Sequence, residues 1–125
     1  MTLKPLLWVS SSKSDLQKMP EDVQADFGYG LHLAQLGERP YTAKVLSGFG
    51  GASVLELKED HKGDTFRAVY TVIFTDAIFV LHVFQKKSKS GITTPKKDIE
   101  LIHSRLKLAE DMYRKFKLEK GKAHE

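Results

Sequence analysis

The hydrophobic and polar positions of the chain follow two periods, and the shorter period predicts strands. Polar and apolar residues alternate along Val54–Lys58, and the runs Phe66–Phe74 and Ile78–Phe84 are rich in β-branched and aromatic residues. Because the turns Asp60–Asp64 and Thr75–Asp76 are short, the three strands should pair as an antiparallel meander. The longer strands are too apolar to face water on both sides. Residues expected to be mostly buried are Leu57, Val69, Val72, Leu81 and Val83.

A helical period of three to four residues flanks these strands on both sides. Ser12 and Pro20 are start signals for two helices that form a hairpin, and Gly37 ends the second one. Thr94 and Pro95 open a longer amphipathic helix, with Thr94 as its cap. The apolar stripe of this last helix consists of Ile99, Ile102, Leu106, Ala109, Tyr113 and Phe116.

Together these elements predict one α+β domain. Leu6–Val9 indicates a first strand, and Lys44–Leu46 indicates a possible short edge strand. The predicted architecture is an N-terminal strand and helical hairpin, an antiparallel sheet of about three to four strands, and a C-terminal helix. We expect the domain to cover residues 1–117, followed by a polar tail over 118–125 that frays.

The composition indicates a globular protein without metal or disulfide chemistry. Of the 125 residues, 41% are hydrophobic and 29% are charged, which is too apolar for a disordered chain. The absence of cysteine excludes disulfides, thiolate nucleophiles and cysteine zinc sites. No histidine or carboxylate group has metal-ligand spacing, so we predict no metal and no cofactor. Leu6–Val9 is too short for a signal-peptide core, and no apolar run reaches the ~20 residues of a membrane helix. We therefore expect a cytoplasmic protein without membrane contact.

The positive charge of the chain is concentrated in one region. The net charge is only +4, but Lys86–Lys97 contains five lysines and no acidic residue. Arg67 and Lys86 should lie at the same end of the strand hairpin. Because adjacent strand residues point to opposite faces, only one of Lys86 and Lys87 can share a face with Arg67. Several cations at one mouth suit a polyanion, and at a reacting phosphate they could stabilise developing charge.

Simpler structural roles also fit these residues. Arg67 can form an ion pair with Glu56 or Glu59 across the hairpin, since structural ion pairs are common. The lysines can form a solvated basic loop. His82 lies among apolar strand residues, and this is typical of a core histidine whose ring nitrogens are hydrogen-bonded.

Motifs over most of the chain resemble one known family. The segment Phe66–Tyr70, FRAVY, resembles a Tyr-Arg-x-x-Tyr strand, and Leu81–Lys87, LHVFQKK, resembles a Leu-x-x-Phe-x-Lys-Lys signature. Thr94, Pro95 and Arg105 follow in the matching order. In combination these segments resemble the HigB toxins of the RelE/ParE superfamily, in the phage-derived branch.

The resemblance implies the toxin of a type II toxin–antitoxin system. Toxins of the RelE and HigB type cleave mRNA in the ribosomal A site without metal, by attack of a 2′-hydroxyl on the adjacent phosphate that yields a cyclic phosphate. Arg67 matches the family's phosphate-binding arginine, and Lys86 or Lys87 matches the basic pair after the last central strand. Further RNA-binding candidates are Lys58, Lys62, Lys89, Lys96 and Lys97. The implied partners are a cognate helix-turn-helix antitoxin and mRNA on the ribosome, with the toxin alone as a monomer.

The chain departs from the family pattern in two places. Glu56 stands where the RelE pattern has a basic residue, and neither a C-terminal catalytic tyrosine nor HigB's acidic-aromatic-histidine ending is recognisable. The resemblance therefore assigns no general base or general acid. Two other functions stay open. One is a ParE-like inhibitor of DNA gyrase, which has the same fold without the catalytic basic set. The other is an inactive prophage remnant that only binds its antitoxin. Retention of Arg67 with Lys86 and Lys87 favours the ribonuclease.

Overall fold

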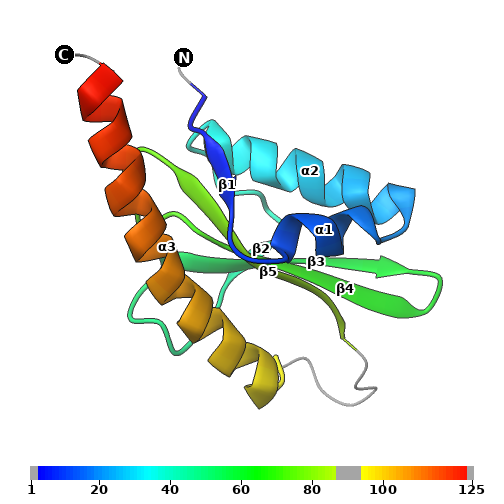
Figure 1. Ribbon diagram of the computed structural model, residues 1–125. Helices are drawn as coiled ribbons and strands as arrows, with labels where there is room; N and C mark the ends of the chain where they lie inside the picture. The colour runs from blue at the N-terminus through cyan, green and yellow to red at the C-terminus, as the bar shows by residue number, and fades with distance from the viewer. Residues whose placement is uncertain (1–2, 87–93, 124–125) are drawn as a thin grey trace.

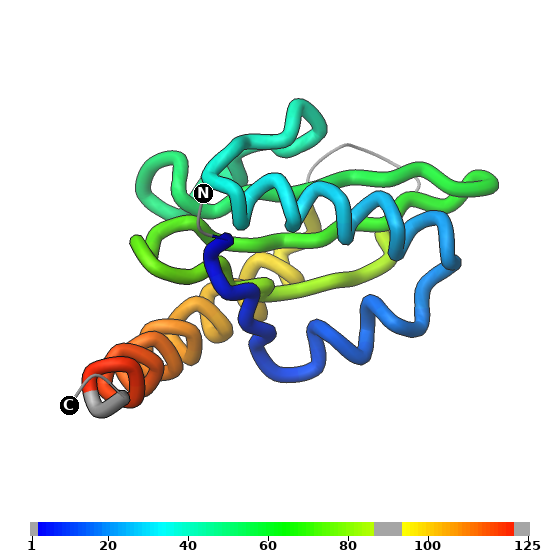
Figure 2. Tube along the Cα trace, turned by 90° about the horizontal axis from the view of Figure 1, so that it is seen from above, coloured from blue at the N-terminus to red at the C-terminus, as the bar shows by residue number. Residues whose placement is uncertain are grey.

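A computed structural model describes residues 3–86 and 94–123 and shows an α+β fold, as predicted. A five-stranded sheet carries two helices on one face and the long C-terminal helix on the other (Figures 1 and 2). The elements are β1 Leu6–Trp8, α1 Ser12–Gln17, α2 Glu21–Gln35, β2 Ala43–Val45, β3 Val54–His61, β4 Asp64–Thr71, β5 Ile78–Lys86 and α3 Lys96–Ala123.

The sheet has the strand order β1-β5-β4-β3-β2 and is mixed. Strands β3, β4 and β5 form the predicted antiparallel meander, and β2 pairs with β3 as the expected short edge strand. Strand β1 adds the fifth strand by pairing parallel to β5, with Leu6 opposite Ile78. The sequence pattern had predicted a purely antiparallel sheet. The parallel pairing of β1 with β5 could not be predicted, because a three-residue strand does not indicate its neighbour.

Two strand boundaries differ from the prediction for local reasons. The hairpin between β3 and β4 turns at Lys62 and Gly63, whose φ angles of 50° and 87° are those of a tight two-residue turn. Both strands are therefore longer at that end than predicted. At the other end β4 stops at Thr71, whose hydroxyl donates to the Ser53 carbonyl at 2.8 Å. Val72 lies beyond the strand and is 37% exposed, so its predicted burial was wrong.

A β-bulge in β5 reverses the side-chain alternation of that strand. The pairs Val69–His82 and Tyr70–Val80 leave Leu81 as an extra residue. As a result Val80 packs with α1 and α2, whereas Leu81 and His82 both face α3. Beyond the bulge Phe84 also packs on the α3 side. Beyond the bulge, each residue of β5 therefore points to the opposite face from the one that regular alternation from Ile78 predicts.

The two faces of the sheet carry separate apolar clusters. On the side of α1 and α2, Phe27 and Leu31 pack against Leu57 and Tyr70. On the other side, Ile102 and Ala109 of α3 pack in one cluster with strand residues; those strand residues are Val54, Val69, Phe79 and Leu81. Apart from Val72, the side chains expected to be buried are buried.

Helix α3 is longer than the sequence pattern predicted. It continues to Ala123, although the tail over 118–125 was predicted to fray. Stacking of the Tyr113 ring on Phe74 holds this part of the helix against the β4–β5 connection. Lys117 adds an ion pair with Asp76. These contacts to the connecting loop explain why the helix extends beyond its apolar stripe.

Two glycines of α2 provide a paired stability test. A Cβ added at Gly30 would lie 2.9 Å from Cδ1 of the buried Leu57, whereas a Cβ at Gly28 would meet no atom within 4 Å. Gly28→Ala should raise the free energy of unfolding by about 0.5–1 kcal/mol, because alanine favours the helix. Gly30→Ala should lose that gain, because overpacking a core typically costs about 1–3 kcal/mol. Urea unfolding of both variants measures the difference. Equal stabilisation by the two variants would contradict the close packing of α2 on β3.

Candidate functional site

The predicted cations of the central strands meet on the α3 face of the sheet. Lys58 of β3 lies directly opposite Arg67 of β4, and Arg67 lies opposite Phe84 of β5. Lys86 is two residues beyond Phe84 and therefore shares the face of Arg67. Lys86 is therefore the lysine of the predicted pair that lies on the same face as Arg67. Lys87 and Lys89 lie outside the described residues.

A cavity of about 500 Å³ opens beside these strands, between the sheet and the start of α3. The residues that line it are Lys44, Val45, Leu46, Ser47, Glu56, Lys58, Arg67, Thr94 and Ile99. The sequence analysis did not select Lys44 or Glu56 as site residues. Lys44 pairs with Glu56, so the two share a face with Lys58 and Arg67. The sequence signal that could have identified Lys44 and Glu56 as site residues is that each is a charged residue in an otherwise apolar part of its strand.

Glu56 forms the centre of the polar contacts in this pocket. Nη1 of Arg67 donates to Oε1 of Glu56 at 2.5 Å, and the Thr94 hydroxyl donates to Oε2 at 2.6 Å. Arg67 and Glu56 are 3% and 7% exposed. Of the two structural ion pairs considered for Arg67, the one with Glu56 is therefore formed. Thr94 was predicted as the cap of the last helix, but α3 begins at Lys96, and the backbone N–H groups of Asp98 and Ile99 donate to the Pro95 carbonyl. The Thr94 side chain instead connects the segment before α3 to β3.

Lys86 lies next to this ion pair and is itself almost buried, with 7% of its surface exposed. Its removal from water lowers the pKa of its ammonium group, and the positive charge of Arg67 lowers it further. The carboxylate of Glu56 acts in the opposite direction. Lys86 is therefore a cation that releases its proton more readily than an ordinary lysine.

The remaining described candidates lie away from the cavity wall. Lys62 occupies the exposed tip of the β3–β4 hairpin, and Lys96 and Lys97 are exposed in the first turn of α3. The structure thus groups Lys44, Lys58, Arg67 and Lys86 in one site and leaves the other three at its periphery.

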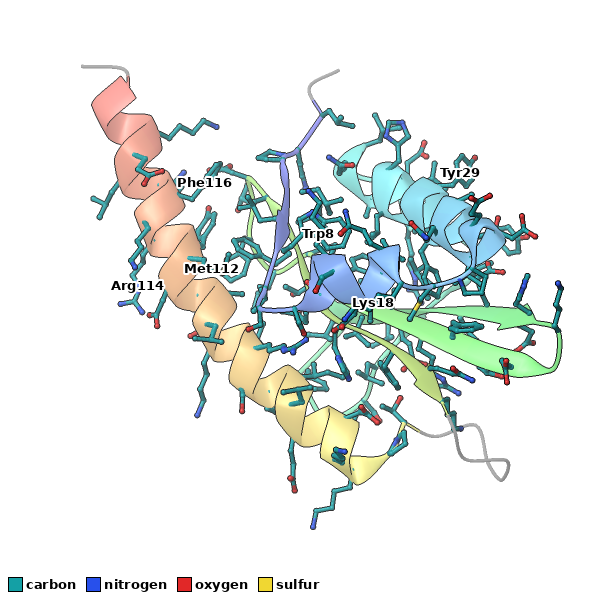
Figure 3. The ribbon with its side chains drawn as sticks, turned by 45° about the vertical axis from the view of Figure 1, so that its right-hand side comes forward. Trp8, Lys18, Tyr29, Met112, Arg114 and Phe116 are labelled. Atoms are coloured by element: carbon teal, nitrogen blue, oxygen red, sulfur yellow. The ribbon has the colours of Figure 1, made fainter. Side chains whose placement is uncertain are left out.

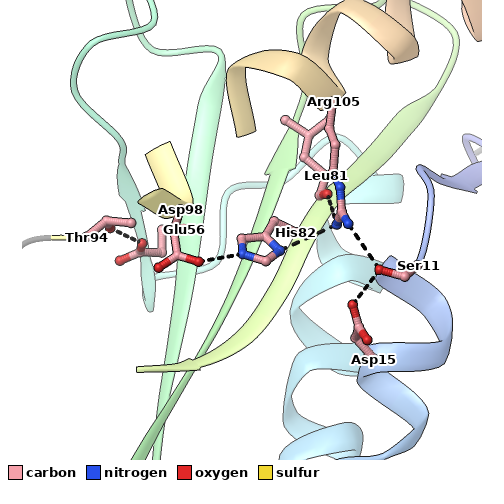
Figure 4. A network of polar contacts seen from close by, with 8 residues as sticks. All are labelled: Ser11, Asp15, Glu56, Leu81, His82, Thr94, Asp98 and Arg105. Carbon is pink, nitrogen blue, oxygen red and sulfur yellow. Dashed lines mark hydrogen bonds and ion pairs between the residues drawn. The ribbon is translucent and has the colours of Figure 1, made fainter. Parts of the chain in front are cut away.

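A second polar network fixes α3 to the sheet next to the pocket (Figure 4). His82 Nε2 lies 2.8 Å from a carboxylate oxygen of Asp98, and the ring stacks on Phe84. Arg105, also nearly buried, donates to the Leu81 carbonyl and to the Ser11 hydroxyl, each at 3.0 Å. The expected structural role of His82 is therefore seen.

His82 should make the stability of the protein depend on pH. Burial lowers the pKa of His82, and Asp98 opposes this only in part. In the unfolded chain the ring titrates near its ordinary value of 6.5 and then binds protons more tightly than in the fold. The free energy of unfolding should therefore fall as the pH drops below about 6.5. His82→Gln should flatten that slope, whereas His103→Gln on the exposed side of α3 should not. Urea unfolding between about pH 5 and 8 tests this. An identical slope in His82→Gln and wild type would contradict it.

Residues 3–86 and 94–123 hold no group of three or more histidine or acidic side chains that could bind a metal. None of the helices in this part of the chain combines the length and apolar character needed to cross a bilayer.

The arrangement of the sheet and helices is that of the RelE toxin fold. The chain belongs to the family described as Phage derived protein Gp49-like (DUF891), whose model matches residues 14–107. Among solved structures, a mutant of the E. coli toxin RelE in the free state matches with a TM-score of 0.56 and 17% identity, over 85% of this chain and 97% of that chain. The toxin–antitoxin complex RelBE2 from Mycobacterium tuberculosis matches with a TM-score of 0.45 and 18% identity, over 70% of this chain and 97% of that chain. Among curated proteins none matches the sequence.

These comparisons confirm the phage-derived family and the RelE-like fold that the sequence motifs indicated. The closer resemblance to HigB stays a prediction.

Proposed function

We propose that this protein is the toxin of a type II toxin–antitoxin system and acts as a metal-independent, ribosome-dependent mRNA endoribonuclease. The observation that carries the proposal is that Lys44, Lys58 and Arg67 line one pocket on a RelE-like sheet, with Lys86 beside them on the same face. Membership of a phage-derived family agrees with it.

The charge distribution suits a reacting RNA phosphate. Arg67 and Lys86 are nearly buried, so their charges act where water screens them weakly. Lys44 and Lys58 are exposed at the rim, where they can contact neighbouring phosphates. In the proposed reaction the 2′-oxygen attacks the adjacent phosphorus. Arg67 and Lys86 then stabilise the extra negative charge of the pentacoordinate transition state. Lys87 and Lys89 stay proposed contacts, together with Lys62, Lys96 and Lys97 along the path of the RNA.

The burial of Arg67 determines which variants test this mechanism. Alanine at this position would break a buried ion pair, a change that typically costs about 3–5 kcal/mol. Arg67→Lys keeps the charge and loses the planar donor fork, and Lys86→Gln removes the charge while staying polar. Each should lower the rate of mRNA cleavage about 10²–10³-fold, as for a lost transition-state donor. The assay measures cleavage of mRNA on purified ribosomes, with melting temperatures as the folding control.

Lys18→Ala is the matched control. This exposed lysine directly follows α1, a helix that packs on the sheet face opposite α3 (Figure 3). Its loss removes one positive charge, as Lys86→Gln does, and should leave cleavage unchanged. A folded Arg67→Lys protein with full activity would remove Arg67 from the mechanism. Intact mRNA together with inhibited gyrase supercoiling would replace the ribonuclease with the gyrase inhibitor.

We also propose that the cognate helix-turn-helix antitoxin covers the basic pocket with an acidic or helical segment. Opposite charges across an interface speed association and make it sensitive to salt. The double variant Lys44→Ala/Lys58→Ala should therefore slow the association rate measured by surface plasmon resonance at low salt. The dependence of that rate on salt should also become weaker. Lys18→Ala should have no such effect. Binding confined to the α1–α2 face, unaffected by the double variant, would exclude this blocking arrangement.

A further inference from the structure

Glu56 is a carboxylate in a pocket whose other charged lining residues are all cations. Among the described residues that line the cavity, it is the one acidic side chain. Lys44 faces it from β2, Arg67 from β4, and Lys86 from β5. A site that only had to hold phosphate would gain from an additional cation at this position. An anion placed here weakens phosphate binding and therefore suggests a chemical role.

We propose that Glu56 is the general base that accepts the proton of the attacking 2′-hydroxyl. The inference rests on the proposed ribonuclease function and supplies the base that the family motifs left unassigned. Arg67, its ion-pair partner, is the proposed phosphate ligand. A phosphate held there would bring the 2′-hydroxyl of the preceding ribose to the same part of the pocket.

The hydrogen bonds of Glu56 hold its carboxylate in a fixed position without using its full capacity. A carboxylate offers roughly four acceptor positions. Arg67 occupies one on Oε1, and Thr94 occupies one on Oε2. Each oxygen can still accept a hydrogen bond from a hydroxyl. Such a fixed orientation is what a general base needs, because proton transfer requires hydrogen-bond reach.

The lysines of the site are less suited to this step. An ammonium group must lose its own proton before it can accept another, whereas a carboxylate is ordinarily ionised at neutral pH. Lys86 instead suits the opposite role, because burial weakens its hold on the proton.

In the proposed cleavage step, the 2′-hydroxyl proton passes to Glu56 as the bond from O2′ to phosphorus forms. The bond from phosphorus to O5′ breaks, and the leaving O5′ takes a proton from the ammonium of Lys86. The products are a 2′,3′-cyclic phosphate and a 5′-hydroxyl. Glu56 and Lys86 recover their starting protonation by exchange with water.

The test compares Glu56→Gln with wild type on ribosome-bound mRNA. Glutamine keeps the size and hydrogen-bonding capacity of the side chain but cannot serve as a base. The cleavage rate should fall about 10²–10⁴-fold, which is the usual contribution of a general base. Binding of a short RNA with a 2′-deoxy nucleotide at the cleavage position should stay as tight as in wild type or become tighter. A purely structural role predicts the reverse, namely weaker binding together with slower cleavage, because Arg67 would lose its anchor.

The pH dependence gives a second readout. A general base acts only in its unprotonated form, so the wild-type rate should fall towards acid pH, and Glu56→Gln should lose this dependence. His82, bonded to Asp98 at the start of α3, is the other nearby titrating group, and His82→Gln shows its contribution. Retention of the acid-side dependence in Glu56→Gln would overturn the proposal.

Glu59→Gln is the matched control, since Glu59 lies on the same strand but faces Asp26 of α2 on the other side of the sheet. It should cleave at the wild-type rate. If Glu56→Gln does not fold at the assay temperature, Glu56→Asp replaces it. That variant keeps the carboxylate at a greater distance and should lower kcat without changing the binding of the deoxy RNA. A folded variant with the wild-type rate refutes the proposal and leaves the ribonuclease intact. No cleavage by the wild-type protein refutes both.

Discussion

The bulge at Leu81 is the constraint on which the rest of the α3 face depends. One extra residue in β5 lets Ile78 and Val80 pack under the helical hairpin while His82, Phe84 and Lys86 point to the opposite side. With a regular strand, Lys86 would lie on the face that α1 and α2 cover. The bulge also needs a partner for its backbone, and Arg105 of α3 donates to the Leu81 carbonyl. The position of Lys86 and the attachment of α3 therefore have one origin.

Charge burial distinguishes this pocket from an ordinary basic surface. Arg67 and Lys86 are nearly buried, which costs solvation free energy unless a counter-charge compensates. Glu56 supplies that counter-charge, and Thr94 satisfies its second oxygen. The same carboxylate thus allows the cations to be buried and reduces the net positive charge of the pocket. An RNA bound there as proposed would compete with Glu56 for Arg67, so its affinity would depend on the geometry of a single side chain.

The sequence predicted the elements well and the site only in part. Periodicity indicated the meander, the helical hairpin and the last helix, because each has a continuous apolar face. Strand alternation predicted only that one of Lys86 and Lys87 shares a face with Arg67. It could not say which one, because the bulge at Leu81 shifts the alternation of β5. Lys44 was missed because β2 is too short for a periodic signal, and its register with β3 depends on packing. Glu56 was considered only as an ion-pair partner of Arg67, because the cavity that it lines is formed by packing and not by a local pattern. The exposure of Val72 depends on a hydroxyl contact of Thr71 with Ser53, and no local pattern reveals such a contact. The far end of α3 depends on Asp76 and Phe74, which belong to a distant loop.

The segment from Thr94 to Asp98, which leads into the first turn of α3, is hydrogen-bonded to two strands that do not neighbour each other. Thr94 bonds to Glu56 of β3, and Asp98 bonds to His82 of β5, so the segment crosses β4 at the level of Arg67. Local unfolding of this single turn would break both bonds and uncover the arginine in one event. The same opening equilibrium would then determine both the access of a ligand to the pocket and the rate of hydrogen exchange at the first α3 amides. Suppose that a ligand can reach Arg67 only when the turn is open. Its apparent affinity would then be its intrinsic affinity multiplied by the fraction of molecules in which the turn is open.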